Sequence, residues 1–182
     1  MTGENRAGAH AGAPSEPPTD IDMLNYALTL EHLEYAFYRD GLQQFSADDF
    51  AAAGYAANVY EWFGIIRDHE MEHVDTITTV ITDLGGKPVA EAKYDFGYTD
   101  LAGFVGVAQV LENTGVSAYQ GAAPFLIDED ELLTAALTIH GVEARHAAYL
   151  NGLQGESPFP DAVNPTLTPD EVLAAAGPFI IG

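Results

Sequence analysis

Two segments, Glu70-Met-Glu-His73 and Glu143-Ala-Arg-His146, constrain the fold more strongly than any other part of the chain. In each, a glutamate and a histidine are three residues apart, which places them on one face of a helix, about 4.5 Å apart along its axis. A lone glutamate precedes each segment, Glu31 before the first and Glu112 before the second. This order of ligand types is what a bundle of four helices needs to hold two metal ions bridged by carboxylates.

Apolar residues at helical spacing surround these segments and predict four long helices. The expected ranges are about 20–44, 55–84, 99–122 and 128–152, with a short helix over 47–53. Residues 86–98 have no helical pattern and can extend roughly 40 Å, enough to connect opposite ends of two long helices. A fifth helix begins at the capping box Thr168-Pro-Asp-Glu171. No window alternates as a strand does, so the prediction is an all-α, four-helix bundle with one long crossover and a short C-terminal fifth helix.

We expect three regions along the chain. Residues 1–18 contain Gly, Ala, Pro, Ser and Glu without periodicity and predict a disordered acidic tail. Residues 19–155 form the bundle, and residues 156–182 form a C-terminal extension whose short helix packs on it. Trp62, in the second long helix, is expected in the core.

The cost of burying charge supports a metal site in the bundle. Four carboxylates in an apolar interior would repel one another and resist burial by several kcal/mol each, and two divalent cations remove that penalty. Imidazole and carboxylate ligands together suit Fe, Mn or Zn. The chain has no cysteine, which excludes thiolate zinc sites and iron–sulfur clusters. The predicted ligands are Glu31, Glu70, His73, Glu112, Glu143 and His146.

A tyrosine follows each lone glutamate by seven residues, Tyr38 after Glu31 and Tyr119 after Glu112. Seven residues make about two helical turns, so each tyrosine lies on the face of its glutamate. We interpret these coincidences as a duplicated helical hairpin that closes with pseudo-two-fold symmetry. Glu34 is also compatible with an inward face and is the alternative to Glu31, which we prefer because of its tyrosine.

With this pattern the chain resembles the ferritin-like superfamily of di-iron and di-manganese carboxylate proteins. It is most similar to the ferritin-like family that includes desiccation-related proteins. The narrower resemblance covers about 20–182 and rests on two stretches, Leu28-Thr-Leu-Glu-His-Leu-Glu-Tyr-Ala-Phe-Tyr38 and Leu167-Thr-Pro-Asp-Glu-Val-Leu-Ala-Ala-Ala-Gly-Pro-Phe-Ile180.

The resemblance implies a role for each candidate residue. Glu70 and Glu143 would bridge two divalent transition-metal ions, iron before manganese or zinc. Glu31 and Glu112 would be single ligands, His73 and His146 would each bind one ion, and Tyr38 and Tyr119 would lie beside the site as hydrogen-bonding or redox-active groups. Fe(II) oxidation, or another reaction with O2 or H2O2, would follow, although a manganese catalase needs the same ligands. A non-catalytic stress- or desiccation-related protein with a vestigial site is the alternative, so the assignment as an enzyme stays open.

A rival enzyme class follows from His69-Glu70-Met-Glu-His73, which matches the H-E-x-x-H zinc-protease signature. That site needs a third ligand and a substrate cleft, usually bordered by a strand, and it leaves Glu143 and His146 without a role. His69 and His140 flank the two motifs, and we expect them to be partly exposed, with contact to the ligands as the alternative.

The charge balance excludes other classes. The chain has 28 acidic and 6 basic residues and a net charge of −22, which disfavours nucleic acids and anionic membranes as partners. This acidic, lysine-poor composition is typical of proteins from salt-accumulating halophiles, where screening makes self-repulsion tolerable. Residues 1–6 show no export signal and no apolar run spans a bilayer, so we expect a cytoplasmic protein, with self-association left open.

Overall fold

The computed structural model describes residues 17–182, and its first helix, α1 (Asp20–Gln44), begins with a reciprocal cap. The hydroxyl of Thr19 accepts a hydrogen bond from the backbone N–H of Asp22, whose carboxylate accepts one from the backbone N–H of Thr19. Helices α2 (Ala47–Ala52) and α6 (Pro169–Ala176) begin with the same device. The tail predicted over residues 1–18 falls almost entirely on residues 1–16, which lie outside the described part of the chain.

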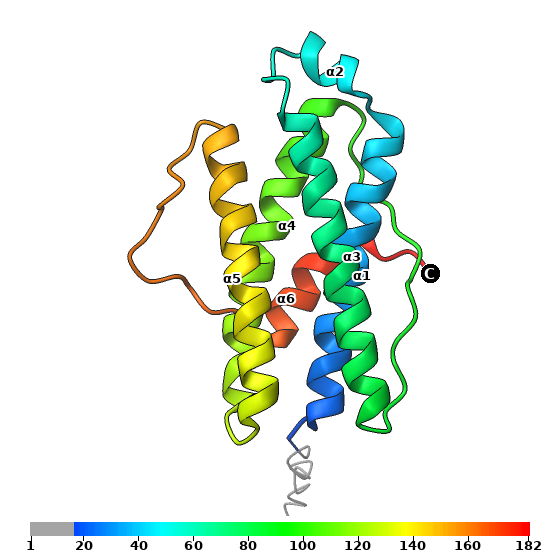
Figure 1. Ribbon diagram of the computed structural model, residues 1–182, viewed down its shortest axis with the longest axis vertical. Helices are drawn as coiled ribbons and strands as arrows, with labels where there is room; N and C mark the ends of the chain where they lie inside the picture. Colours follow the sequence, from blue (N-terminus) through cyan, green and yellow to red (C-terminus); the bar gives the residue numbers. More distant parts are fainter. Residues whose placement is uncertain (1–16) are drawn as a thin grey trace, which may run out of the picture.

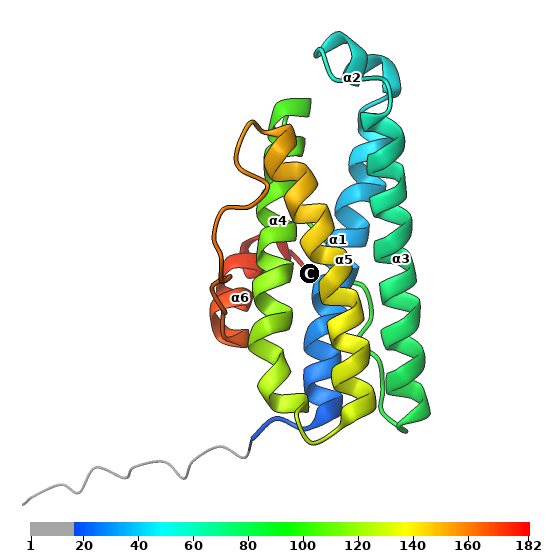
Figure 2. The same ribbon diagram turned by 60° about the vertical axis from the view of Figure 1, so that its left-hand side comes forward.

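The bundle consists of two antiparallel helical hairpins (Figures 1 and 2). Helix α1 packs against α3 (Val59–Asp83), and α4 (Leu101–Ala122) packs against α5 (Asp130–Leu153). Two 3₁₀ turns, η1 (Ala123–Leu126) and η2 (Gly177–Phe179), follow α4 and α6. Helix α6 packs on the outer side of α4 (Figure 2). The predicted all-α fold is confirmed, and none of the described helices combines the length and apolarity that crossing a membrane requires.

One predicted boundary is wrong, because α3 begins at Val59 and not at residue 55. Gly54 has a φ of 88°, which ends α2 and reverses the chain. The backbone N–H of Tyr55 then donates to the carbonyl of Phe50, so residues 55–58 form a turn and not the first turn of a helix.

The predicted long crossover connects α3 to α4, and it runs along α1 (Figure 1). The side chain of Asn25 donates to the carbonyl of Lys87 and accepts from the backbone N–H of Val89. Further along the crossover, Nη1 of Arg39 donates to both carboxylate oxygens of Glu91. The first half of the crossover is therefore anchored on α1, and its second half forms backbone hydrogen bonds with residues 179–182.

The core differs between the two ends of the bundle. One end is aromatic, with Phe37 stacked on Phe104 and Phe63 close by, whereas the other end is aliphatic around Leu28 and Ile81. The buried carboxylates lie between these two clusters. The prediction that Trp62 belongs to the core is wrong: it is 44% exposed and packs edge-on against Tyr149 in a groove between α3 and α5.

Candidate metal centre

The structure brings the six predicted ligands together from four helices. Ligand atoms of Glu31, Glu70, His73 and Glu143 all lie within 4.8 Å of one another, and those of Glu70, Glu112, Glu143 and His146 form a second such group. All six residues are buried. The two groups share Glu70 and Glu143, which is the arrangement that two ions bridged by two carboxylates require.

The two histidines present the same ring nitrogen to the carboxylates. Nδ1 of His73 lies 3.1 Å from Oε2 of Glu31 and 3.0 Å from Oε2 of Glu70. Nδ1 of His146 lies 3.1 Å from Oε1 of Glu70 and 3.2 Å from Oε2 of Glu112. Glu70 therefore contacts both histidines, one through each carboxylate oxygen, as a bridging ligand would.

Buried carboxylates set the protonation of these rings. Burial by itself lowers the pKa of a histidine, but the surrounding carboxylates outweigh it. They raise the pKa of His73 far above its usual value and that of His146 to about 9. The carboxylates therefore favour the doubly protonated rings, and a metal ion that binds at Nδ1 would have to displace the proton there.

Each tyrosine bonds to the glutamate of the opposite hairpin. The hydroxyl of Tyr38, on α1, donates to Oε1 of Glu112, on α4, over 2.6 Å. The hydroxyl of Tyr119, on α4, donates to Oε1 of Glu31, on α1. This exchange is what a pseudo-two-fold axis between the hairpins produces. Burial and the adjacent carboxylate raise the pKa of both phenols, which keeps them protonated as donors.

The carboxylate oxygens that lack a hydrogen bond show what the cluster needs. Both oxygens of Glu143 are buried, and neither accepts a hydrogen bond from the described residues. Nδ1 of His73 lies 3.3 Å from Oε1 of Glu143, but it is not aligned for a hydrogen bond. Burial, and then the charges of Glu70 and Glu112, raise the pKa of Glu143 well above its usual range. Burial likewise raises the pKa of Glu70 to about 7. A pair of divalent cations would satisfy these lone pairs, so the residues present fit the predicted metals.

Glu34 adds a further carboxylate that only one hairpin possesses. It is 3% exposed, and burial followed by the charges of neighbouring glutamates raises its pKa well above the usual value. It lies outside both groups of ligand atoms, which agrees with our preference for Glu31. Its counterpart on α4, three residues after Glu112, is Gly115. A Cβ atom there would lie 3.1 Å from Oε1 of Glu34 and 2.9 Å from Oε2 of Glu143, so the glycine leaves the room that both carboxylates occupy.

The structure places His69 behind His146 and not among the carboxylates. Nδ1 of His69 lies 2.9 Å from Nε2 of His146, and the rings are stacked. His69 is half-buried, as predicted, and so is His140, which belongs to neither group of ligand atoms. The zinc-protease pattern requires His69 as a ligand, so this geometry disfavours it. The pairing across helices was not predictable from the spacing of the sequence motif.

Two helical hairpins around a buried Glu/His cluster of this kind define the carboxylate-bridged class of metal-binding bundles. Residues 19–156 match the model of the ferritin-like domain family, and the chain belongs to that family. Protein rds1 of Schizosaccharomyces pombe is 28% identical over 165 residues, which cover 90% of this chain. The chain spans 40% of the length of that relative.

Proposed function

We propose that the protein binds two divalent transition-metal ions, preferably iron, in the buried cluster and uses them in a reaction with dioxygen or hydrogen peroxide. The observation that carries this proposal is the pair of overlapping ligand groups with Glu70 and Glu143 in common. Membership of the ferritin-like family supports the metal site, because folds of this class build such sites from the same residue types.

The chemistry that bound iron supplies is electron transfer to the oxidant. A ferroxidase reaction would convert two Fe(II) ions, one O2 and two protons into two Fe(III) ions and one H2O2. The glutamates and histidines of the cluster would hold the ions while their charge changes. Glu31 and Glu112 each keep a hydrogen bond from a tyrosine of the opposite hairpin, which fixes the orientation of the two terminal carboxylates.

Anaerobic Fe(II) titration of chelator-treated protein tests the metal site. We expect two equivalents bound per chain, a lower melting temperature after chelation, and recovery when metal is restored. Glu143→Gln removes a shared ligand and is expected to abolish the binding of the pair. Glu131→Gln, at an exposed position in the first turn of the same helix, is the matched control and should bind normally. Binding that is equal in both variants would refute the site.

Stopped-flow mixing of the loaded protein with O2 tests the reaction. Rapid appearance of Fe(III) with H2O2 as product supports the ferroxidase form. Disproportionation of H2O2 by the manganese-loaded protein supports the catalase form, which uses the same ligands. If metal binding stabilises the fold but no oxidant reacts, the site has a structural role and the oxidoreductase assignment is wrong.

We further propose that the acidic surface is an adaptation to high salt. The 28 acidic residues repel one another strongly at low ionic strength, and molar salt screens that repulsion. Denaturation in a KCl series should therefore give a free energy of unfolding that rises with salt. Equal stability at low and molar KCl would contradict this proposal.

A further inference from the structure

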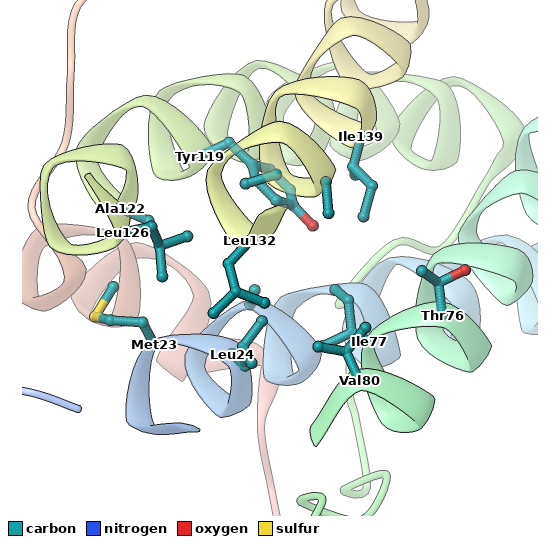
Figure 3. Close-up of a pocket in the computed structure, with 13 residues that line it drawn as sticks. Met23, Leu24, Thr76, Ile77, Val80, Tyr119, Ala122, Leu126, Leu132 and Ile139 are labelled. Atoms are coloured by element: carbon teal, nitrogen blue, oxygen red, sulfur yellow. The ribbon is translucent and has the colours of Figure 1, made fainter. Parts of the chain in front are cut away.

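A small cavity lies beside the metal-binding cluster, at the aliphatic end of the bundle (Figure 3). Its volume is about 40 Å³, and its walls come from all four long helices and from η1. The lining is aliphatic, with Leu24 from α1, Ile77 from α3, and Leu132 and Ile139 from α5. None of the predicted metal ligands lines this cavity, so it is distinct from the metal site itself.

Tyr119 connects the cavity to the cluster. Its side chain extends from α4 among the lining residues (Figure 3), and its hydroxyl donates to Glu31. One side chain thus forms the wall of the cavity and also touches a predicted ligand. Thr76 and Ile139 line both this cavity and the surface groove that contains His73. The cavity therefore adjoins the groove as well as the cluster.

Small side chains maintain the empty space. Ala27, Ala122, Ala135 and Ala136 all line the cavity, where larger aliphatic residues would fill it. Filling would favour stability, since unfilled apolar volume forfeits packing contacts. An apolar cavity that costs stability and adjoins a predicted reaction site is expected to have an occupant.

Size and polarity define that occupant. A cavity near 150 Å³ admits benzene, so a space of about 40 Å³ excludes organic molecules of that size. Water needs two to four polar partners in a buried site, and apart from the Tyr119 hydroxyl and Thr76 the walls are apolar. An Fe(II) ion would find no carboxylate here. A neutral, apolar molecule of very few atoms remains, and dioxygen is such a molecule.

We propose that this cavity is a holding site for dioxygen beside the metal centre. The inference rests on the proposed function for the purpose of the site, whereas occupancy by dioxygen depends only on the cavity. In this arrangement dioxygen reaches the metal centre through the apolar cavity, while metal ions and protons use the groove that contains His73.

Occupancy is measurable on the metal-free protein. Dissolved dioxygen is paramagnetic, so it accelerates the NMR relaxation of the methyl groups it contacts. Under oxygen pressure we expect stronger enhancement at the methyls of Ile77 and Ile139 than at Leu30, a comparably buried residue of α1 that does not line the cavity. Enhancement no greater than at Leu30 would overturn the proposal.

Three variants test whether the relaxation enhancement by dioxygen follows the size of the cavity. Ala136→Val narrows the cavity and should reduce the enhancement, and Ile139→Val widens it and should preserve or increase it. Ala102→Val places a valine in the exposed first turn of α4 and should leave the enhancement unchanged. Thermal melts establish that each variant is folded. An enhancement insensitive to both cavity variants would also overturn the proposal.

Kinetics on the iron-loaded protein separate the cavity from the function. Ala136→Val should retain both equivalents of Fe(II) but react several-fold more slowly at low dioxygen concentration, with Ala102→Val as control. A variant that loses the enhancement but keeps the full rate would refute the role in supply. If the wild-type protein shows the enhancement but never reacts, the proposed oxidation fails while the binding site for dioxygen stands.

Discussion

Replacing Gly115 by alanine should damage the metal site while sparing the fold. The added Cβ would lie 2.9 Å from Oε2 of Glu143 and 3.1 Å from Oε1 of Glu34, and both atoms are the ends of flexible side chains. The backbone can therefore stay in place while the two carboxylates move away from α4. Because Glu143 is a predicted bridging ligand, that movement alters the geometry of both ions.

The structure gives the expected magnitudes. A glycine-to-alanine change inside a helix stabilises a protein by about 1 kcal/mol where nothing obstructs the new methyl group. Gly64, in α3, meets that condition, because no atom lies within 4 Å of its added Cβ. At Gly115 the crowding costs about 1–3 kcal/mol, so the metal-free variant should range from unchanged to about 2 kcal/mol less stable. Displacement of the Glu143 carboxylate should weaken metal binding by about 10–100-fold.

Chemical denaturation of metal-free protein and Fe(II) binding isotherms, run on both glycine variants, measure these effects. Gly64→Ala should gain stability and bind metal normally. Gly115→Ala should lose affinity by more than its small change in stability explains. If Gly115→Ala instead matches Gly64→Ala in both stability and metal affinity, the positions of the Glu34 and Glu143 carboxylates do not require a glycine at residue 115, and our account of the site is wrong.

Three further predictions concern the buried cluster. Measurement of bound metal per chain should find about one ion fewer in His146→Ala. His69→Ala should lose only about 10-fold in affinity, since His69 contacts the ring of His146 and is not itself a predicted ligand. An empty site in His69→Ala together with a full site in His146→Ala would reverse the ligand assignment. The pKa of Glu70 in the folded protein is about 7 and exceeds the ordinary 4.5, so the folded metal-free protein binds a proton that the unfolded chain has lost, and its free energy of unfolding should fall as pH rises from 4.5 through 7. Over the same range metal affinity should increase, and calorimetry should detect the release of protons on metal binding. A free energy of unfolding that rises over this range in the metal-free protein would contradict the prediction. Tyr38→Phe and Tyr119→Phe each remove the phenol that donates a hydrogen bond to a buried carboxylate, and each should lower the free energy of unfolding of the metal-free protein by about 1–3 kcal/mol. Urea denaturation measures this change, and an unchanged free energy of unfolding would show that the hydroxyls do not stabilise the cluster.

The helices were predictable because their signals are local. The apolar period of each long helix and the capping box at Thr168 act within a few residues, and the structure contains both. The start of α3 was placed too early because the turn over 55–58 follows from the conformation of Gly54, which an apolar pattern does not encode. Such patterns specify which residues share a face, but not where the chain reverses.

The partners across the bundle were not predictable in this way. The spacing from Glu31 to Tyr38 correctly put both on one face, yet the hydroxyl of Tyr38 bonds to Glu112 on the other hairpin. Similarly, Trp62 has a helical spacing suited to the core but lies in a groove, because its face of α3 points toward α5 and not toward α1. Both outcomes depend on how the two hairpins are rotated against each other, which the period of a single helix leaves undetermined.

Comparison of the two hairpins, position by position, carries more information than either alone. The predicted ligands repeat, but Glu34 on α1 corresponds to Gly115 on α4, and His69 on α3 corresponds to Val142 on α5. A repeat selected only for stability would not retain an additional buried carboxylate, which costs several kcal/mol without a cation nearby. Glu34 lies near Glu143, which belongs to both groups of ligand atoms, whereas His69 contacts His146, which belongs to only one of them. The repeated residues thus supply the same ligand types to two predicted metal positions, and the contact of His69 with His146 makes those two positions chemically different.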